Sequence, residues 1–456
     1  MKELHLLNRL GFGPRPGDLE KVNLLGIDGY IEWQLSPESI AEPRELQQQI
    51  GQLEALQLNT LELYRKFGPP SKKKNMNPNN EGGDRKRPYQ ILQEAAQGRI
   101  MRAVASPRQL EEVMVDFWFN HFNIFARDLN RLWAGSYEQE AIRPYAMGSF
   151  RQLLGATARH PAMLFYLDNW LNTAPDSPGA RGRFRGLNEN YARELLELHT
   201  LGVDGGYTQD DVIVLARIFT GWGFPPQKKG SRYGGEFYFD ESRHDFRQKV
   251  LLGQTISGQG IAEGEAALDI LANHPATAKH ISYKLAQYFV ADDPPQSLVH
   301  TLSRRFLETQ GDIRAVLETL FQSDEFWDLQ FEQAKFKTPY QYIVSSLRAS
   351  NTEINNYQRI LGSFNQLAMP IYQCRTPDGY QQTQDTWLSP DAMLRRISFA
   401  IALGQGRFSD RKPVDAIELS QTLGDNFSVE TKNVIDSHRP NEQAALMLGS
   451  PEFMRC

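Results

Sequence analysis

The chain has 456 residues, of which 40% are hydrophobic and 23% are charged. This balance is that of a folded protein, and the length suits one large or two ordinary domains. A net charge of −5 argues against nucleic acid or an anionic membrane as the partner. The two cysteines, Cys374 and Cys456, exclude a disulfide framework. No apolar run reaches the length of a membrane span and no signal peptide is evident, so we expect a cytoplasmic protein.

Hydrophobic periodicity predicts helices along most of the chain. A long helix is expected from about Pro43 to Phe67, and a second helix, after Ser106, presents Phe117 and His121 on one apolar face. Shorter helices fit three further stretches, which are Glu138–Ala146, Phe150–Ala158 and Pro161–Leu167. After Glu263 the pattern is helical again.

Two stretches rich in glycine, proline and polar residues, 68–90 and 171–187, are predicted to be exposed loops. The first has the length of a lid as well as of a solvated loop. Near 230–260 the pattern becomes β-like, and Glu236–Phe239 is expected to pair with Lys249–Leu252. We therefore predict a mainly α-helical fold, in which residues 1–456 form a single large domain with a small β ribbon.

Residues 188–223 read as two helices joined by a tight turn. Asn188 is a candidate N-cap, and Gly202 is a candidate for the left-handed residue that ends the first helix. Thr208 and Asp211 have the spacing of a capping box at the start of the second helix. The segment is therefore predicted to be a helical hairpin.

Spacing on the first helix decides which side chains meet. Glu189, Arg193 and Glu197 stand four residues apart and form an acid–base–acid ladder. Glu194 and Glu197 fall close together, whereas His199 lies on the apolar side. One helix cannot aim Glu194, Glu197 and His199 at a single ion, so a ligand set needs another segment. The alternative interpretation is a surface ladder beside a hydrogen-bonded core histidine.

Three further histidines have surroundings that would suit a site. His121 lies among aromatic residues, His160 precedes a proline at a helix start, and His244 precedes Asp245. If they converge on the hairpin, their imidazoles and the glutamates would suit a divalent metal such as zinc, iron, manganese or copper. The alternative interpretation is a satisfied core histidine, which is the commoner role of a lone histidine on an apolar face. At Cys374, a thiol nucleophile is weighed against a buried, inert cysteine.

Several segments together resemble a known family. They are Leu187–Val203, Gly206–Thr208, Ala216–Trp222, His5–Gly13, Phe117–Phe122, His160–Met163 and His274–Pro275. This combination is similar to the signature of the bacterial domain of unknown function 1800. The resemblance carries no established activity. It implies that many relatives are exported and are encoded beside a sulfatase-like family, which would be a candidate partner protein. The absence of an export signal here departs from that pattern.

Two functional hypotheses follow. In the first, the protein is an enzyme with a pocket near the 188–223 hairpin. Glu194 and Glu197 then act as acid/base or ligand groups, and Arg193 or Arg217 serves as an anion clamp. Either His199 or His121 would be the partner of these groups, and the candidate metal ligands are His121, His160 and His244. In the second, the protein is a non-catalytic scaffold or assembly factor that presents a helical surface to a partner protein.

Overall fold

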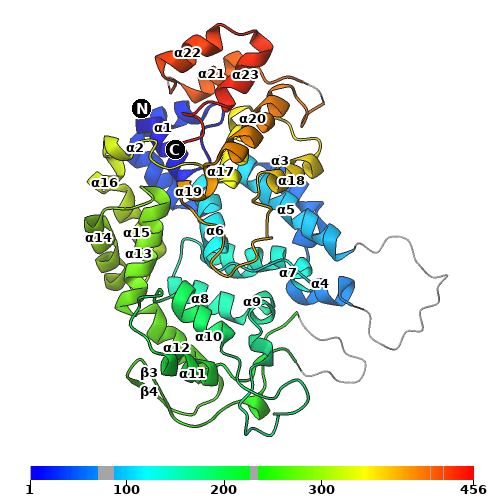
Figure 1. Ribbon diagram of the computed structural model, residues 1–456, viewed down its shortest axis with the longest axis vertical. Helices are drawn as coiled ribbons and strands as arrows, with labels where there is room; N and C mark the ends of the chain where they lie inside the picture. The colour runs from blue at the N-terminus through cyan, green and yellow to red at the C-terminus, as the bar shows by residue number, and fades with distance from the viewer. Residues whose placement is uncertain (1, 70–86, 226–234, 411, 425) are drawn as a thin grey trace, which may run out of the picture.

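Helices dominate the structure (Figure 1). The computed structural model describes residues 2–69, 87–225, 235–410, 412–424 and 426–456, and these contain 23 α-helices and two two-stranded sheets. The predicted mainly α-helical class is therefore confirmed. Residues 70–86 of the predicted first loop and 230–234 of the predicted β-like insertion lie outside the described residues. None of the described helices is long and apolar enough to cross a bilayer.

The first half of the chain runs from the top of the view in Figure 1 to its lower end. Its α-helices are α1 (Lys2–Leu10), α2 (Asp18–Leu35), α3 (Arg44–Gly51), α4 (Thr60–Phe67), α5 (Pro88–Ala105), α6 (Gln109–His121), α7 (Asn130–Tyr137), α8 (Phe150–Arg159), α9 (Pro161–Tyr166), α10 (Asn190–Glu194) and α11 (Gln209–Ile218). The segment between α9 and α10 is irregular apart from a 3₁₀ turn (Asn169–Leu171) and an isolated bridge, which confirms the predicted loop at 171–187.

The second half returns along the opposite side to the top of the molecule. Its strands are β1 (Trp222–Gly223), β2 (Tyr238–Phe239), β3 (Lys249–Leu251) and β4 (Gln254–Ile256). Its helices are α12 (Ile261–Ala272), α13 (Pro275–Phe289), α14 (Gln296–Glu308), α15 (Ile313–Phe321), α16 (Asp324–Trp327), α17 (Pro339–Ala349), α18 (Tyr357–Gln366), α19 (Gln384–Trp387), α20 (Pro390–Gly404), α21 (Ala416–Leu423), α22 (Val429–Asp436) and α23 (Pro440–Leu448).

The predicted helix from Pro43 to Phe67 is wrong, because the chain breaks there into α3, a 3₁₀ turn (Glu54–Leu56) and α4. Leu53 takes an extended conformation, with φ −86° and ψ 102°. Asn59 then restarts the helix through a capping box with Glu62, in which each side chain bonds the other residue's backbone N–H. The helical spacing of the apolar residues continues across this break, but the extended Leu53 and the cap at Asn59 divide the segment into separate helices.

The predicted pairing of 236–239 with 249–252 is also wrong. β2 pairs with β1, and β3 pairs with β4, both antiparallel. Leu252 and Gly253 join β3 to β4 and both have positive φ, 47° and 77°, as a two-residue hairpin turn requires. A strand closed by its own tight turn finds its partner within the next few residues, so the longer-range pairing is not needed.

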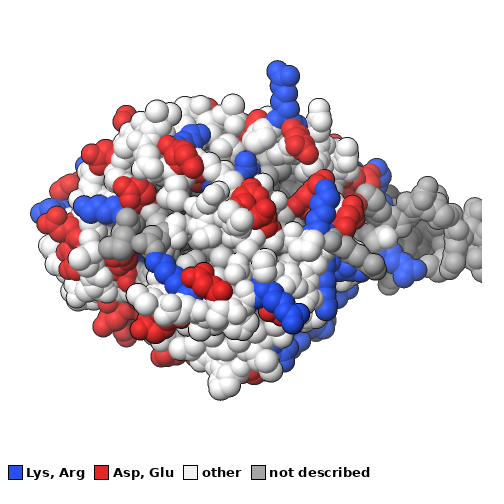
Figure 2. All heavy atoms as spheres, turned by 90° about the horizontal axis from the view of Figure 1, so that it is seen from above, with Lys and Arg blue, Asp and Glu red and all other residues white. Residues whose placement is uncertain are grey.

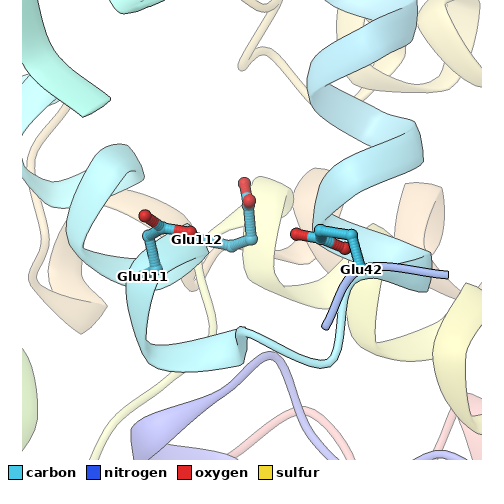
Figure 3. Close-up of side chains that lie close together, drawn as sticks. All are labelled: Glu42, Glu111 and Glu112. Atoms are coloured by element: carbon cyan, nitrogen blue, oxygen red, sulfur yellow. The ribbon is translucent and has the colours of Figure 1, made fainter. Parts of the chain in front are cut away.

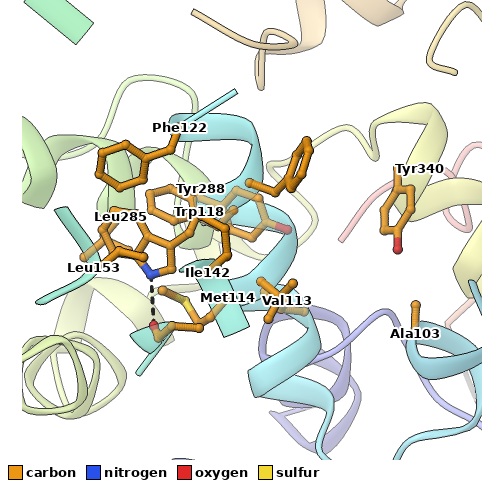
Figure 4. Packing of buried hydrophobic residues seen from close by; sticks show 14 of the residues in the cluster. Ala103, Val113, Met114, Trp118, Phe122, Ile142, Leu153, Leu285, Tyr288 and Tyr340 are labelled. Atoms are coloured by element: carbon orange, nitrogen blue, oxygen red, sulfur yellow. Dashed lines mark hydrogen bonds between the residues drawn. The ribbon is translucent and has the colours of Figure 1, made fainter. Parts of the chain in front are cut away.

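The centre of the molecule is α6 (Figure 1). All of its residues except Glu111 and Asn120 are buried, as expected of a helix surrounded by other elements. The wholly buried Trp118 donates its indole N–H to the carbonyl of Ala146 at 2.9 Å (Figure 4). One connected cluster of buried hydrophobic side chains includes this helix and extends from Leu6 to Met454.

On the face that Figure 2 shows, acidic and basic side chains are intermingled. This pattern agrees with the small net charge of the sequence. Such a mixed face provides no broad electrostatic footprint of one sign there for a polyanion.

Candidate functional site

The helix that carries Glu194, Glu197 and His199 changes its winding halfway along. α10 ends at Glu194 and continues as a π-helical turn, η6 (Leu195–His199). The hydroxyl of Thr200 donates to the carbonyl of Leu195 at 2.5 Å, and Gly202 N donates to the carbonyl of Leu196 at 3.1 Å. Isolated π-turns occur frequently at functional sites, so this turn marks the hairpin as a candidate.

Two of the local features predicted for the hairpin are confirmed, whereas Asn188 is not the N-cap: α10 begins at Asn190, so Glu189 takes the N-cap position, and the Asn188 side chain accepts from Asn190 N at 3.0 Å. Gly202 has a φ of 84°, the left-handed conformation expected at the end of the first helix. Thr208 and Asp211 form the capping box of α11. Arg193 bridges Glu189 at 3.2 Å and Glu197 at 3.5 Å, so the predicted ladder is present on the half-exposed side of the helix.

Three histidines from three elements meet over the π-turn. The ring centroid of His121, at the end of α6, lies 6.2 Å from that of His199 and 6.1 Å from that of His280 on α13. His121 Nε2 donates to the carbonyl of His199 at 3.1 Å, and His280 Nε2 donates to the carbonyl of Leu198 at 3.2 Å. The two imidazoles thus satisfy carbonyls at a helix end, which otherwise lack donors.

Burial keeps all three imidazoles neutral. It lowers the pKa of His199 to about 3 and that of His280 to about 4, and it holds the pKa of His121 well below its usual range. Mutual repulsion among the rings and the charge of Lys284 add to the effect on His121. Within the described part of the chain, Nε2 of His199 has no hydrogen-bond partner. The cluster is therefore a neutral layer in which two rings donate to backbone carbonyls and His199 keeps a buried nitrogen without a partner among the described residues.

The end of α6 also anchors a distant segment, 374–380, beside this layer. Asn120 and Tyr380 exchange two hydrogen bonds of 2.8 Å, one from the Asn120 amide to the Tyr380 carbonyl and one from Tyr380 N to Asn120 Oδ1. The Asn123 amide donates to the carbonyl of Thr376 at 2.8 Å. A Cβ at Gly379 would lie 2.3 Å from the Asn120 carbonyl, so only glycine allows this close approach.

Several ionisable groups of the hairpin, α13 and segment 374–380 influence one another's pKa. The carboxylate of Asp378, on the anchored segment, is exposed, and its charge acts on Glu194, Lys284 and Tyr166. Burial raises the pKa of Glu194, and the charge of Glu197 raises it further. Burial lowers the pKa of Lys284, while Asp378 opposes that change. The charge of Asp378 therefore acts both on an acid with a raised pKa and on an amine with a lowered pKa.

His160 lies in a different network. Its Nδ1 accepts from Ala162 N at 3.2 Å and so caps α9, while its Nε2 lies 3.0 Å from the Thr60 hydroxyl and 3.8 Å from a Glu140 oxygen. Burial lowers its pKa, against the opposing effect of Glu140. The contacts of this histidine join α4, η3 (Glu138–Ile142) and α9, and none of them reaches the hairpin glutamates.

His244 lies in a third network. Its Nδ1 faces the carbonyl of Thr220 at 2.8 Å, and its Nε2 faces Glu263 at 2.9 Å. Glu263 also pairs with Lys249 at 2.5 Å, and both partners hold the pKa of this carboxyl below its usual value despite burial. The two ring nitrogens of His244 thus face oxygen atoms of Thr220 and Glu263, and these contacts tie the β segments to α12.

A group of buried charged residues, centred on Arg99, also lies against α6. Arg99 pairs with Asp116 at 2.6 Å and with Glu138 at 3.1 Å, and its guanidinium lies over the rings of Phe119, Tyr340 and Tyr372. A cavity of about 30 Å³, room for one or two water molecules, lies beside Arg99 and reaches Cys374. Burial raises the pKa of that thiol, so Cys374 has the character of an inert core cysteine.

One set of three carboxylates, Glu42, Glu111 and Glu112, lies close together among the described residues (Figure 3). Their oxygens lie within 4.8 Å of one another, and no other described trio of imidazole, thiol or carboxylate groups does so. Arg143 holds Glu112 through two hydrogen bonds, of 2.6 and 2.9 Å, and Arg108 lies 3.7 Å from Glu42. Arginines thus balance the charge that a cation would otherwise neutralise.

The structure therefore brings His121 and His199 together, with Glu194 one turn earlier on the helix of His199, while His160 and His244 serve other networks. His280, Lys284 and Asp378 are not among the predicted residues. His280 and Lys284 stand four residues apart on a helix, a spacing that places both on one face and was the available signal. No sequence pattern identifies Asp378, because its position depends on the two hydrogen bonds between Asn120 and Tyr380.

Fold and site together define a mainly helical protein with a half-buried acid–base cluster at the junction of α6, η6, α13 and segment 374–380. The chain belongs to the family described as protein of unknown function (DUF1800), which it matches over residues 5–455. The resemblance drawn from the sequence motifs is thereby confirmed. Searches of curated proteins and of solved structures found no match.

Proposed function

We propose that this protein is an enzyme whose active site is the acid–base cluster around Glu194, Lys284 and Asp378. The observation that carries the proposal is the pair of opposite pKa shifts, upward for the Glu194 carboxyl and downward for the Lys284 amine. Both shifts move the groups toward neutral pH, where proton transfer is most efficient. A surface ladder without a function has no need of such a pair.

The roles follow from the surroundings. Glu194 is the general acid, and the negative charge of Glu197 helps to keep it protonated. Arg193 bonds Glu189, Glu197 and Gln209, so it holds the ladder in place and is not free to clamp an anion. His199 belongs to the neutral layer that supports the π-turn below.

A ligand screen tests the proposal. Full-length protein is screened against small metabolites by thermal shift and turnover, and each hit is repeated with Glu194→Gln and with Glu189→Gln. Glu189 is the matched control because it directly precedes the same helix and, among the described residues, its carboxylate bonds Arg193 and Gln209. Loss of binding or turnover in the Glu194 variant alone supports the site. Equal retention by both variants, with lower stability of the Glu194 variant, contradicts it.

A metal-assisted version of the site remains a proposal, but with a smaller ligand set than the sequence predicts. His160 and His244 are engaged elsewhere, which leaves His121 and the free nitrogen of His199 near Glu194. Metal content of the purified protein and thermal shifts with Zn²⁺, Mn²⁺ and Fe²⁺ measure this version. Stoichiometric metal that is lost in His199→Gln supports it, and metal content unchanged by that substitution refutes it.

The scaffold hypothesis has an observation of its own. Leu394, Ile397 and Ile401 on α20 are 63%, 41% and 41% exposed, and their spacing places them on one face. Such an apolar stripe suits a partner protein, and the family resemblance suggests a sulfatase-like one. Native mass spectrometry of the two purified proteins tests this, with Leu394→Ser expected to weaken a complex. Leu329→Ser, at an isolated exposed leucine, is the control.

A further inference from the structure

Arg102, on α5, differs from two other arginines near the carboxylates of Figure 3. The Arg143 guanidinium bonds both oxygens of Glu112, at 2.6 and 2.9 Å. Arg108 donates from its Nε to the carbonyl of Ile40 at 2.8 Å. The guanidinium of Arg102 makes no hydrogen bond or ion pair with any described residue, although its Nε is buried. A guanidinium carries five N–H donors, so a partly buried one without acceptors is costly.

Arg102 and Glu42 line the same cavity, which has a volume of about 260 Å³ and lies between α3 and α5. Oε1 of Glu42 accepts from the Ser106 hydroxyl at 2.8 Å, whereas its buried Oε2 has no donor among the described residues. No hydrogen bond or ion pair joins Glu42 to Arg102, although the charge of Glu42 acts on that guanidinium. One cavity is therefore lined by an oxygen that lacks a donor and by donors that lack an acceptor.

The rest of the cavity wall is largely aliphatic. Leu46 and Ile50 stand four residues apart and so lie on one face of α3, and both line the cavity. Leu56, on the 3₁₀ turn before α4, adds a third aliphatic side chain. The amides of Gln47 and Gln57 donate to backbone carbonyls at 3.1 and 3.0 Å. The cavity thus offers one negative charge, one positive charge and an apolar surface.

We propose that this cavity binds a small zwitterion, namely an α-amino acid with an aliphatic side chain. The ligand carboxylate accepts from the Arg102 guanidinium, which can hold a carboxylate through two parallel hydrogen bonds. The ligand ammonium donates to Oε2 of Glu42, and the side chain packs on Leu46 and Ile50. A simple anion or a simple cation would leave one of the two charged groups without a partner.

The size of the cavity favours a single amino acid over a peptide. Its volume of about 260 Å³ lies just below the range of about 300–1,000 Å³ that is usual for ligand pockets. The site is built by α3, α5 and the turn between them, whereas the acid–base cluster belongs to α6, η6, α13 and segment 374–380. The inference therefore stands apart from the function proposed above.

Isothermal titration calorimetry of the full-length protein tests the inference with L-leucine and three analogues. L-Leucine is expected to bind saturably at one site. N-acetyl-L-leucine lacks the ammonium group and L-leucinamide lacks the carboxylate, so each should bind at least about tenfold more weakly, as the loss of a hydrogen bond between charged groups predicts. L-Aspartate keeps both charges but places a carboxylate on the aliphatic wall, and it should also bind more weakly.

Two variants locate the site. Arg102→Gln and Glu42→Gln should each weaken L-leucine binding at least about tenfold. Arg44→Gln is the matched control, because Arg44 is exposed on α3 and is not part of the cavity wall, and its affinity should equal that of the wild type. Absence of L-leucine binding at millimolar concentrations overturns the inference. Equal binding of either capped analogue by the wild-type protein also overturns it, whether or not the two variants fold.

Discussion

Removing Arg99 should destabilise the protein more than any surface substitution. Arg99 is 7% exposed and neutralises two buried carboxylates, Asp116 at 2.6 Å and Glu138 at 3.1 Å. Removing one partner of a buried ion pair typically costs about 3–5 kcal/mol, because a charge is left without compensation. Arg99→Met also loses the stacking on Phe119 and Tyr340, worth about 0.5–2 kcal/mol for each ring. The lower ends of these ranges add to about 4 kcal/mol, so we expect a loss of at least about 4 kcal/mol at pH 7.

Urea unfolding followed by tryptophan fluorescence measures this loss. Arg314→Met is the control, because Arg314 makes a two-contact ion pair with Glu38 at the surface, at 3.0 and 3.1 Å. Exposed pairs contribute about 0–1 kcal/mol, so the control should unfold at nearly the wild-type urea concentration. Similar midpoints for the two variants would show that the Arg99 cluster contributes no more than a surface pair.

The pH dependence gives a second check on Arg99. Burial raises the pKa of Asp116, and Arg99 is the main group that lowers it again, so the substitution should raise that pKa further. The folded variant then holds a proton that the unfolded chain releases above about pH 4. Its stability therefore falls as pH rises through the raised pKa, and the deficit relative to wild type should be smaller at pH 5 than at pH 8. A constant deficit would refute the electrostatic explanation.

Substitutions at three further positions test other contacts. Glu263→Gln should cost about 3–5 kcal/mol in urea unfolding, since it leaves the buried ammonium group of Lys249 without its carboxylate and His244 without its acceptor. The pKa of Glu263 is lowered, so wild-type stability should fall as pH drops below about 4.5 and protonates this carboxyl, and the variant should lack that fall. Thr208→Ala removes the α11 cap and should cost about 1 kcal/mol, whereas Thr208→Ser should cost little. Gly202→Ala should cost at least about 1–2 kcal/mol and shift the NMR signals of His280, because φ is 84° and a Cβ would lie 2.9 Å from that ring.

The sequence determined the features that depend on neighbours within one or two turns. The Thr208–Asp211 cap, the Glu189–Arg193–Glu197 ladder and the left-handed Gly202 follow from spacing alone. So does the burial of His199, because helical periodicity separates an apolar side from a polar side. The sequence motifs also predicted the family to which the chain belongs.

Tertiary structure alone decided which of these residues share a site. His280 and Asp378 reach the hairpin from segments about 80 and 180 residues away, where α13 packs on α6 and Gly379 meets Asn120. The same packing drew His160 and His244 into separate networks. Periodicity reports which face of a helix is buried, whereas the neighbour that covers this face is selected by shape and hydrogen bonding across the whole core.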